Sequence, residues 1–163
     1  MSDLGTVDVS LTADEKFGEF LESRQMKYTT ERRIIVDEVF SSHDHFDAED
    51  LVAKLHRRRD GRRVSRSTVY RTLGYLVDAG LLRKMALGNR EVYEHDYGYP
   101  QHDHLYCQQC STLIEFKNDS LRSLRDEVCR EHGFRPVSHR LVIYGTCANC
   151  NRSRVSKRRL DMV

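Results

Sequence analysis

Apolar residues recur three and four positions apart in four stretches of the first half of the chain, the spacing that gathers them on one face of an α-helix. The first stretch runs from Asp14 to Arg24, and the fourth runs from Arg66 to Ala79 and stops at Gly80. Between them, Thr30 and Asp47 are residue types that cap helix N-termini, and each precedes an apolar stripe. The pattern predicts four helices.

A different spacing follows the fourth helix. Leu81 to Met85 and Arg90 to Glu94 fit short strands, and Leu87-Gly88-Asn89 fits the turn between them. Helices followed by a hairpin predict a winged helix-turn-helix. In such a fold the fourth helix, capped by Ser65, enters the DNA major groove by its N-terminal end.

The second half of the chain has a different pattern of apolar and polar residues, which predicts short strands and one helix. Strands are expected at 104–107, 112–116 and 137–144, and a helix is expected at 120–132, capped by Ser120 or Asp119. Its apolar residues, which we expect to face inward, are Leu121, Leu124 and Val128. The sequence therefore predicts an α+β protein with a winged-helix domain at 1–94, a hinge at 95–101 that contains Gly98 and Pro100, and a metal-binding second domain at 102–163.

Charge is unevenly distributed along the chain, although the net charge is only +2. From Lys54 to Arg90 there are eleven basic and two acidic residues, whereas the first 53 residues hold five basic and thirteen acidic ones. A basic block of this kind is the electrostatic footprint of a polyanion-binding protein. The alternative is a solvated helix face.

The expected cellular compartment decides whether the five cysteines indicate disulfides or a metal site. The N-terminus lacks the basic-then-apolar order of a secretion signal, and no apolar run is long enough to cross a bilayer, so we expect a cytoplasmic protein without a membrane partner. Because the cytoplasm keeps thiols reduced, the cysteines indicate a metal site before disulfides.

Two C-x-x-C pairs, Cys107 with Cys110 and Cys147 with Cys150, have the spacing of zinc knuckles. Together they supply four thiolates, which form a closed tetrahedral site for a structural Zn²⁺. The alternatives are a redox pair or unrelated buried cysteines. Cys129 lies within the expected helix and is assigned a buried apolar role.

A second set of ligand types lies beside the first knuckle. His102-x-His104 places two imidazoles on the same side of a strand entrance, and Glu115 on the neighbouring expected strand can complete that face. Imidazole with carboxylate and no thiolate suits Fe²⁺, Mn²⁺ or Zn²⁺. The alternative is that these are structural histidines.

The fourth expected helix and the basic run before it carry the candidate DNA contacts. Tyr70 and Arg71 are the candidates for base edges, because Arg can bond guanine in two places and a Tyr ring can pack on a thymine methyl group. The candidates for phosphate contacts are Arg62, Arg63, Arg66 and Thr68.

Five motifs in this order resemble the ferric uptake regulator (Fur) family of metal-dependent repressors, from about Tyr28 to Arg152. They are Ser-Arg-Ser-Thr-Val-Tyr-Arg-Thr-Leu (65–73), Ala-Gly-Leu-Leu-Arg-Lys (79–84), His-Asp-His-Leu-Tyr-Cys-Gln-Gln-Cys (102–110), Ile-Glu-Phe (114–116) and Tyr-Gly-Thr-Cys (144–147). The resemblance implies a homodimer that binds operator DNA. Each subunit would have an N-terminal winged helix and a C-terminal α/β dimerisation domain with a structural zinc held by the four cysteines of the two pairs.

The resemblance also assigns a regulatory metal site. It adds His45 and Glu94 to His102, His104 and Glu115, although the sequence alone singles out neither. Peroxide-sensing relatives resemble this site but carry aspartates where this chain has Glu94 and Glu115, which favours Fe²⁺ sensing and control of iron uptake. Zinc, manganese and peroxide sensing stay open as alternatives.

The chain departs from the family at a third site. Gln101 stands where the family has a histidine and Arg122 where it has a carboxylate, which leaves only Asp103 and His139 as a weak third metal site. Two other classes of function are possible. One is a metalloenzyme that uses the His/Glu ligands, although no general base is evident and we expect no enzyme. The other is a metal-independent winged-helix protein whose only ion is structural.

Overall fold

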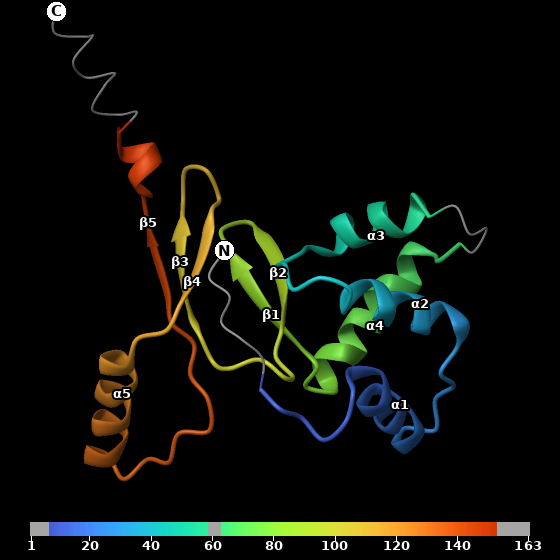
Figure 1. Cartoon of the computed structure of the whole chain (residues 1–163), viewed down its shortest axis with the longest axis horizontal. Helices are drawn as coiled ribbons and strands as arrows, with labels where there is room; N and C mark the ends of the chain where they lie inside the picture. The colour runs from blue at the N-terminus through green and yellow to red at the C-terminus, as the bar shows by residue number, and fades with distance from the viewer. Residues whose placement is uncertain (1–6, 59–62, 153–163) are drawn as a thin grey trace, which may run out of the picture. The chain divides into compact units, whose positions relative to one another are not determined.

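The structure, a computed structural model, describes residues 7–58 and 63–152. Helices and strands are mixed, as the sequence predicts for an α+β protein, and the chain divides into two compact units (Figure 1). The first unit is Gly5–Pro100, and the second begins at Gln101. In the described part of the chain, no helix combines the length and apolar character that a membrane crossing needs.

The first unit begins with four helices, each opened by a side chain that accepts a backbone hydrogen bond. They are α1 (Ala13–Ser23), α2 (Thr30–Val39), α3 (Ala48–His56) and α4 (Arg66–Asp78). Asp47 caps α3 and Ser65 caps α4, as expected from the sequence. The cap of α2 is Thr29 and not Thr30, because two threonines in a row can both serve and Thr30 already has helical geometry.

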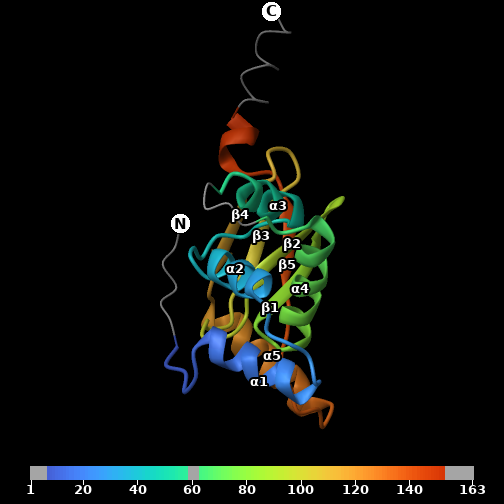
Figure 2. The same cartoon turned by 90° about the vertical axis from the view of Figure 1, so that its right-hand side faces the viewer.

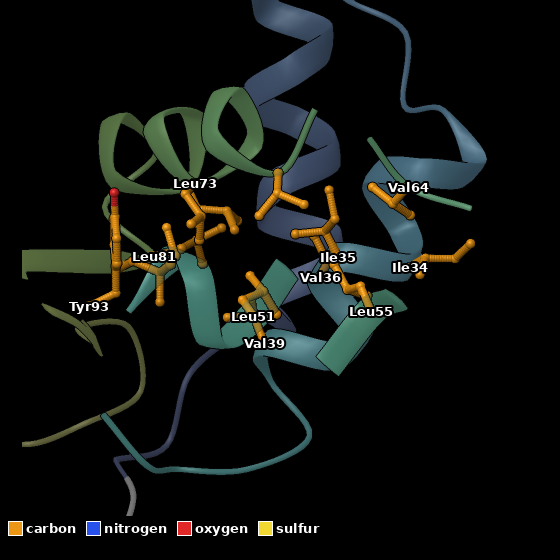
Figure 3. Close-up of a cluster of buried hydrophobic side chains, with 14 of the residues drawn as sticks. Ile34, Ile35, Val36, Val39, Leu51, Leu55, Val64, Leu73, Leu81 and Tyr93 are labelled. Atoms are coloured by element: carbon orange, nitrogen blue, oxygen red, sulfur yellow. The ribbon is translucent and has the colours of Figure 1, made fainter. Parts of the chain in front are cut away.

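The core of the first unit lies where α2, α3 and α4 meet (Figure 3). Ile35 of α2, Leu51 of α3 and Leu73 of α4 point toward one another and are at most 3% exposed. Figure 2 shows α4 along one side of this unit, with α2 and α3 packed beside it. Burial of this face orients α4 and leaves its other side accessible.

A hairpin follows α4 and completes the winged-helix arrangement. Strands β1 (Leu82–Leu87) and β2 (Arg90–His95) pair antiparallel in the register Leu82↔His95 to Leu87↔Arg90. Gly88 in the turn has φ 61°, a conformation that glycine adopts at little cost. The expected hinge does not begin at residue 95, since His95 belongs to β2 and Asp96 donates its N–H to the Leu81 carbonyl at 3.1 Å.

The second unit contains a three-stranded sheet. The central strand β3 (Asp103–Cys107) pairs antiparallel with β4 (Leu113–Phe116) and parallel with β5 (Val142–Gly145) (Figure 1). The expected strand at 137–144 was too long at its start. Its pairing with β3 begins only at Val142, and Val137 is 98% exposed.

Helix α5 (Asp119–Glu131) differs from expectation in two ways. Its cap is Asn118, whose side chain accepts the N–H of Leu121 at 3.0 Å, and not Ser120 or Asp119. Its apolar residues do not face inward, because Leu124 is 55% and Val128 46% exposed and none of the helix is buried. The described part of a single chain leaves this apolar face uncovered.

Candidate metal centre and nucleic-acid interface

The four predicted zinc ligands lie together in the second unit. Cys107 ends β3, and the parallel pairing of Cys107 with Gly145 brings the loop after β5 beside it. Cys110 and Cys147 follow these two strands, and Cys150 lies in the helical residues 148–152. The four sulfur atoms lie within 4.8 Å of one another, and Cys110 Sγ is 3.6 Å from Cys147 Sγ. Cys129 is not part of this cluster.

The groups around the thiols favour thiolate at two positions and oppose it at another. The backbone N–H groups of Cys147 and Cys110 point at Cys107 and lower the pKa of its thiol to about 6. The Thr112 hydroxyl lowers the pKa of Cys110. The neighbouring sulfurs of Cys110 and Cys147 raise the pKa of Cys150 to about 12. Four thiolates this close together repel one another, and a bound cation removes that repulsion. Four sulfurs at this spacing suit tetrahedral Zn²⁺.

The imidazole set also belongs to the second unit. The rings of His102 and His104 lie on the same side of the chain, with centroids 4.8 Å apart. Glu115 of β4 stands opposite His104 in the strand register, and one of its carboxylate oxygens is 3.9 Å from His102 Nε2. His104 is only 2% exposed. The expected His-His-Glu face is therefore present within this unit.

A smaller ligand pair lies in the first unit. His45 Nε2 is 3.2 Å from a carboxylate oxygen of Glu94, which is 4% exposed. The pair forms because Phe46 makes an isolated β-bridge with Tyr93, which brings the loop before α3 onto β2. Arg83 also lies 3.8 Å from Glu94 and contacts Asp96. No motif in the sequence signals this bridge, so His45 and Glu94 could be found only through the family resemblance.

Asp103 and His139 lie together, as the weak third site requires, but the positively charged side chain of Arg125 lies beside them. His139 Nε2 is 3.2 Å from Asp103, and Arg125 Nη1 is 2.8 Å from His139 Nδ1. Arg122, which stands where the family has a carboxylate, pairs with Asp119 on α5. The guanidinium of Arg125 opposes a metal ion at this pair through its charge.

The candidate DNA contacts lie at the N-terminal end of α4, except Arg62, which lies outside the described residues. Arg63, Arg66 and Arg71 are exposed, and Tyr70 is 41% exposed. The Thr68 hydroxyl is 2.8 Å from that of Ser65, so it supports the helix cap. The described candidates therefore lie around the start of α4, within the basic block of the sequence, and all of them except Thr68 are exposed.

Glu49 of α3 was not expected to take part in this surface. Its carboxylate lies 2.6 Å from Arg66 Nη2 and accepts the hydroxyl hydrogen bond of Tyr70. The Arg66 guanidinium also lies over the Tyr70 ring, 5.6 Å from the centroid. The Glu49 carboxylate therefore contacts two of the candidate DNA-binding side chains of the same chain.

Comparison with known proteins agrees with the fold. The model of the Ferric uptake regulator family matches residues 23–144. A ferric uptake regulation protein of Campylobacter jejuni is 30% identical over 137 residues, which cover 84% of this chain and 87% of the relative.

Two solved structures are similar over most of their length. The ferric uptake regulator of Pseudomonas aeruginosa with manganese is 30% identical, with TM-score 0.69, over 80% of this chain and 97% of that one. The regulator of Francisella tularensis with iron is 26% identical, with TM-score 0.67, over 77% and 95%. The chain therefore belongs to the ferric uptake regulator family of metal-responsive transcriptional regulators, which are not enzymes.

Proposed function

We propose that this chain is a repressor controlled by one regulatory ion that the two units bind together. The ligands are His45 and Glu94 from the winged-helix domain (1–94) and, from the second domain (102–163), His102, His104 and Glu115. The observation that carries the proposal is that each unit holds an incomplete set, one His–Glu contact of 3.2 Å and one His–His–Glu group. One ion that uses both sets fixes the hinge between the two domains.

Ferrous iron is the regulatory ion that we favour. The set contains imidazole and carboxylate but no thiolate, which suits Fe²⁺, Mn²⁺ and Zn²⁺. Relatives of this chain are named for ferric uptake regulation, and similar structures carry iron or manganese. Glutamate at both carboxylate positions, 94 and 115, favours iron over peroxide sensing. Zinc and manganese sensing are the alternatives within the same family.

The four cysteines hold a structural Zn²⁺ in this proposal. The ion joins the turn after β3 to the segment after β5, and it fills all four tetrahedral positions. Because no position stays open for substrate or water, this site supports the fold and takes no part in sensing. We place the protein in the cytoplasm, where reduced thiols remain available to the metal.

Members of this family are DNA-binding dimers. We assign the dimer interface of this chain to the uncovered apolar surfaces of the second unit. Leu124 and Val128 supply it from α5, and the sheet adds a row of exposed side chains that stand opposite one another in register: Leu105, Ile114 and Ile143. A second copy is the partner that buries the same surface on both sides.

The DNA target is a double-stranded operator with two half-sites. The dimer presents two α4 helices, and their separation must match half-sites about 34 Å apart. Tyr70 and Arg71 are assigned to base edges, and the phosphate contacts are Arg62, Arg63, Arg66 and Thr68. The regulatory ion couples to DNA by favouring one separation of the helices, and coupling of this kind typically changes affinity about 5- to 150-fold.

DNA binding with and without metal tests the proposal. Zinc-loaded protein is prepared anaerobically, and its affinity for a promoter fragment is measured with added Fe²⁺, Mn²⁺ or Zn²⁺ and with chelator. We expect retardation that depends on the regulatory ion and is strongest with Fe²⁺. Equal retardation with chelator contradicts the proposal and favours a metal-independent winged-helix protein.

A further inference from the structure

A polar pocket of about 340 Å³ lies in the first unit, where the N-terminal ends of α2 and α4 come together. Both helix caps, Thr29 and Ser65, line it. The helices are ten and thirteen residues long, so each presents the positive end of a full helix dipole to the pocket. Two helix N-termini that share one pocket form a site for an anion.

The side chains in the pocket add positive charge to that of the helix dipoles. Three guanidinium groups line it, those of Arg32, Arg63 and Arg71, against the single carboxylate of Glu31. Arg32 is already held in place, because it donates to the Lys27 carbonyl and lies over the Tyr75 ring at 5.2 Å. A guanidinium fixed in this way loses little conformational freedom when it binds an oxyanion.

Thr72 supplies an independent indication of a ligand. It lines the pocket, is 1% exposed, and its hydroxyl has no hydrogen-bond partner among the described residues. Buried hydroxyl groups are almost always hydrogen-bonded, since an unpaired one is costly. An oxygen acceptor bound in the pocket would provide the partner that the protein does not.

We propose that this pocket binds a phosphate group, supplied by the DNA backbone or by free phosphate. The helix N-termini and guanidiniums match the charge and the hydrogen-bonding needs of phosphate oxygens, and Thr72 adds a hydroxyl donor. The DNA source rests on the proposed function, but it gives Arg71 a phosphate in place of a base edge. Binding of free phosphate does not rest on the proposed function.

Titration of the full-length zinc-loaded protein with inorganic phosphate, against chloride at equal ionic strength, tests the pocket directly. The readouts are calorimetry and the backbone amide signals of Thr68 and Thr72. Arg71→Gln should weaken phosphate binding about tenfold, because a charge-assisted hydrogen bond is lost. Thr72→Val keeps the side-chain shape and removes the hydroxyl. It should also weaken binding and yet raise the melting temperature, because the unpaired group is gone.

Arg24→Gln is the matched control. It removes the same charge near the other end of α4, where Arg24 pairs with Asp78 at 3.5 Å. The control should bind phosphate like the unaltered protein. If phosphate does not bind, or if all three variants bind it equally, the pocket proposal is overturned.

A DNA titration at several salt concentrations distinguishes the two sources of phosphate. If the DNA backbone is the source, free phosphate competes with the operator, and Arg71→Gln lowers the salt slope by about 1 per occupied pocket. If only free phosphate binding is lost while the salt slope stays unchanged, the occupant is free phosphate. If the unaltered protein binds no DNA with any metal, the proposed function fails, and the phosphate titration still decides the pocket.

Discussion

Replacing Glu49 with Gln should strengthen DNA binding by this protein. The Glu49 carboxylate lies 2.6 Å from Arg66 Nη2 and accepts a hydrogen bond from Tyr70. Arg66 and Tyr70 are both candidate DNA contacts, so this carboxylate competes with DNA for the same two side chains. DNA binding must break the contact before phosphate or base can replace it.

The size of the effect follows from the exposure of the pair. The side chains of Arg66 and Glu49 are 66% and 54% exposed, so solvent screens their attraction. Exposed ion pairs of this kind are worth about a 1.5- to 5-fold change in an equilibrium constant. The Gln amide can still accept from Tyr70, so only the charge contribution is lost. A dimer with two α4 helices should bind its operator about 2- to 25-fold more tightly.

Fluorescence anisotropy with a labelled operator and saturating regulatory metal measures this change. Glu22→Gln is the control, because it removes the same charge from an exposed position on α1. The double variant with Arg66→Gln completes a cycle, in which the Glu49 effect should disappear. Equal tightening by Glu22→Gln, or an effect that survives the loss of Arg66, would refute the contact as the cause.

Four further variants test the metal sites and the dimer. His102→Ala should abolish metal-dependent DNA retardation while the zinc content, measured by mass spectrometry, stays unchanged; loss of zinc would show that the two ligand sets do not act separately. Cys147→Ser should lose zinc and lower the melting temperature of the second unit, whereas Cys129→Ser, outside the cluster, should retain both. Leu105→Asp places a charge on the exposed sheet face and should shift the dimer toward monomer in analytical ultracentrifugation, and an unchanged sedimentation coefficient would exclude this face from the interface.

Much of the fold could be predicted because local signals mark its elements. Ser65 and Gly80 bracket α4, and both lie where the sequence places the cap and the stop, with Gly80 at φ 66°. Helix α5 shows the limit of such signals. Its periodicity correctly identifies an apolar face with Leu124 and Val128, but periodicity does not say whether the same chain covers that face.

The candidate site could be predicted only in part for a similar reason. The thiol pairs and His102-x-His104 are close in sequence, so spacing alone brings them together. His45 and Glu94 meet through the bridge between Phe46 and Tyr93, which no local pattern indicates. At the third site, Arg125 lies against His139. No pattern in the sequence signals this contact.

Strand β3 limits how the sequence can lengthen during evolution. The strand supplies a ligand to each set, because His104 lies inside it and Cys107 lies at its end. Side chains alternate between the two faces of a strand, so one inserted residue between them would turn either the imidazole or the thiol to the wrong face. Homologous chains of different length should therefore differ by an even number of residues between these two positions, unless a β-bulge absorbs the extra residue.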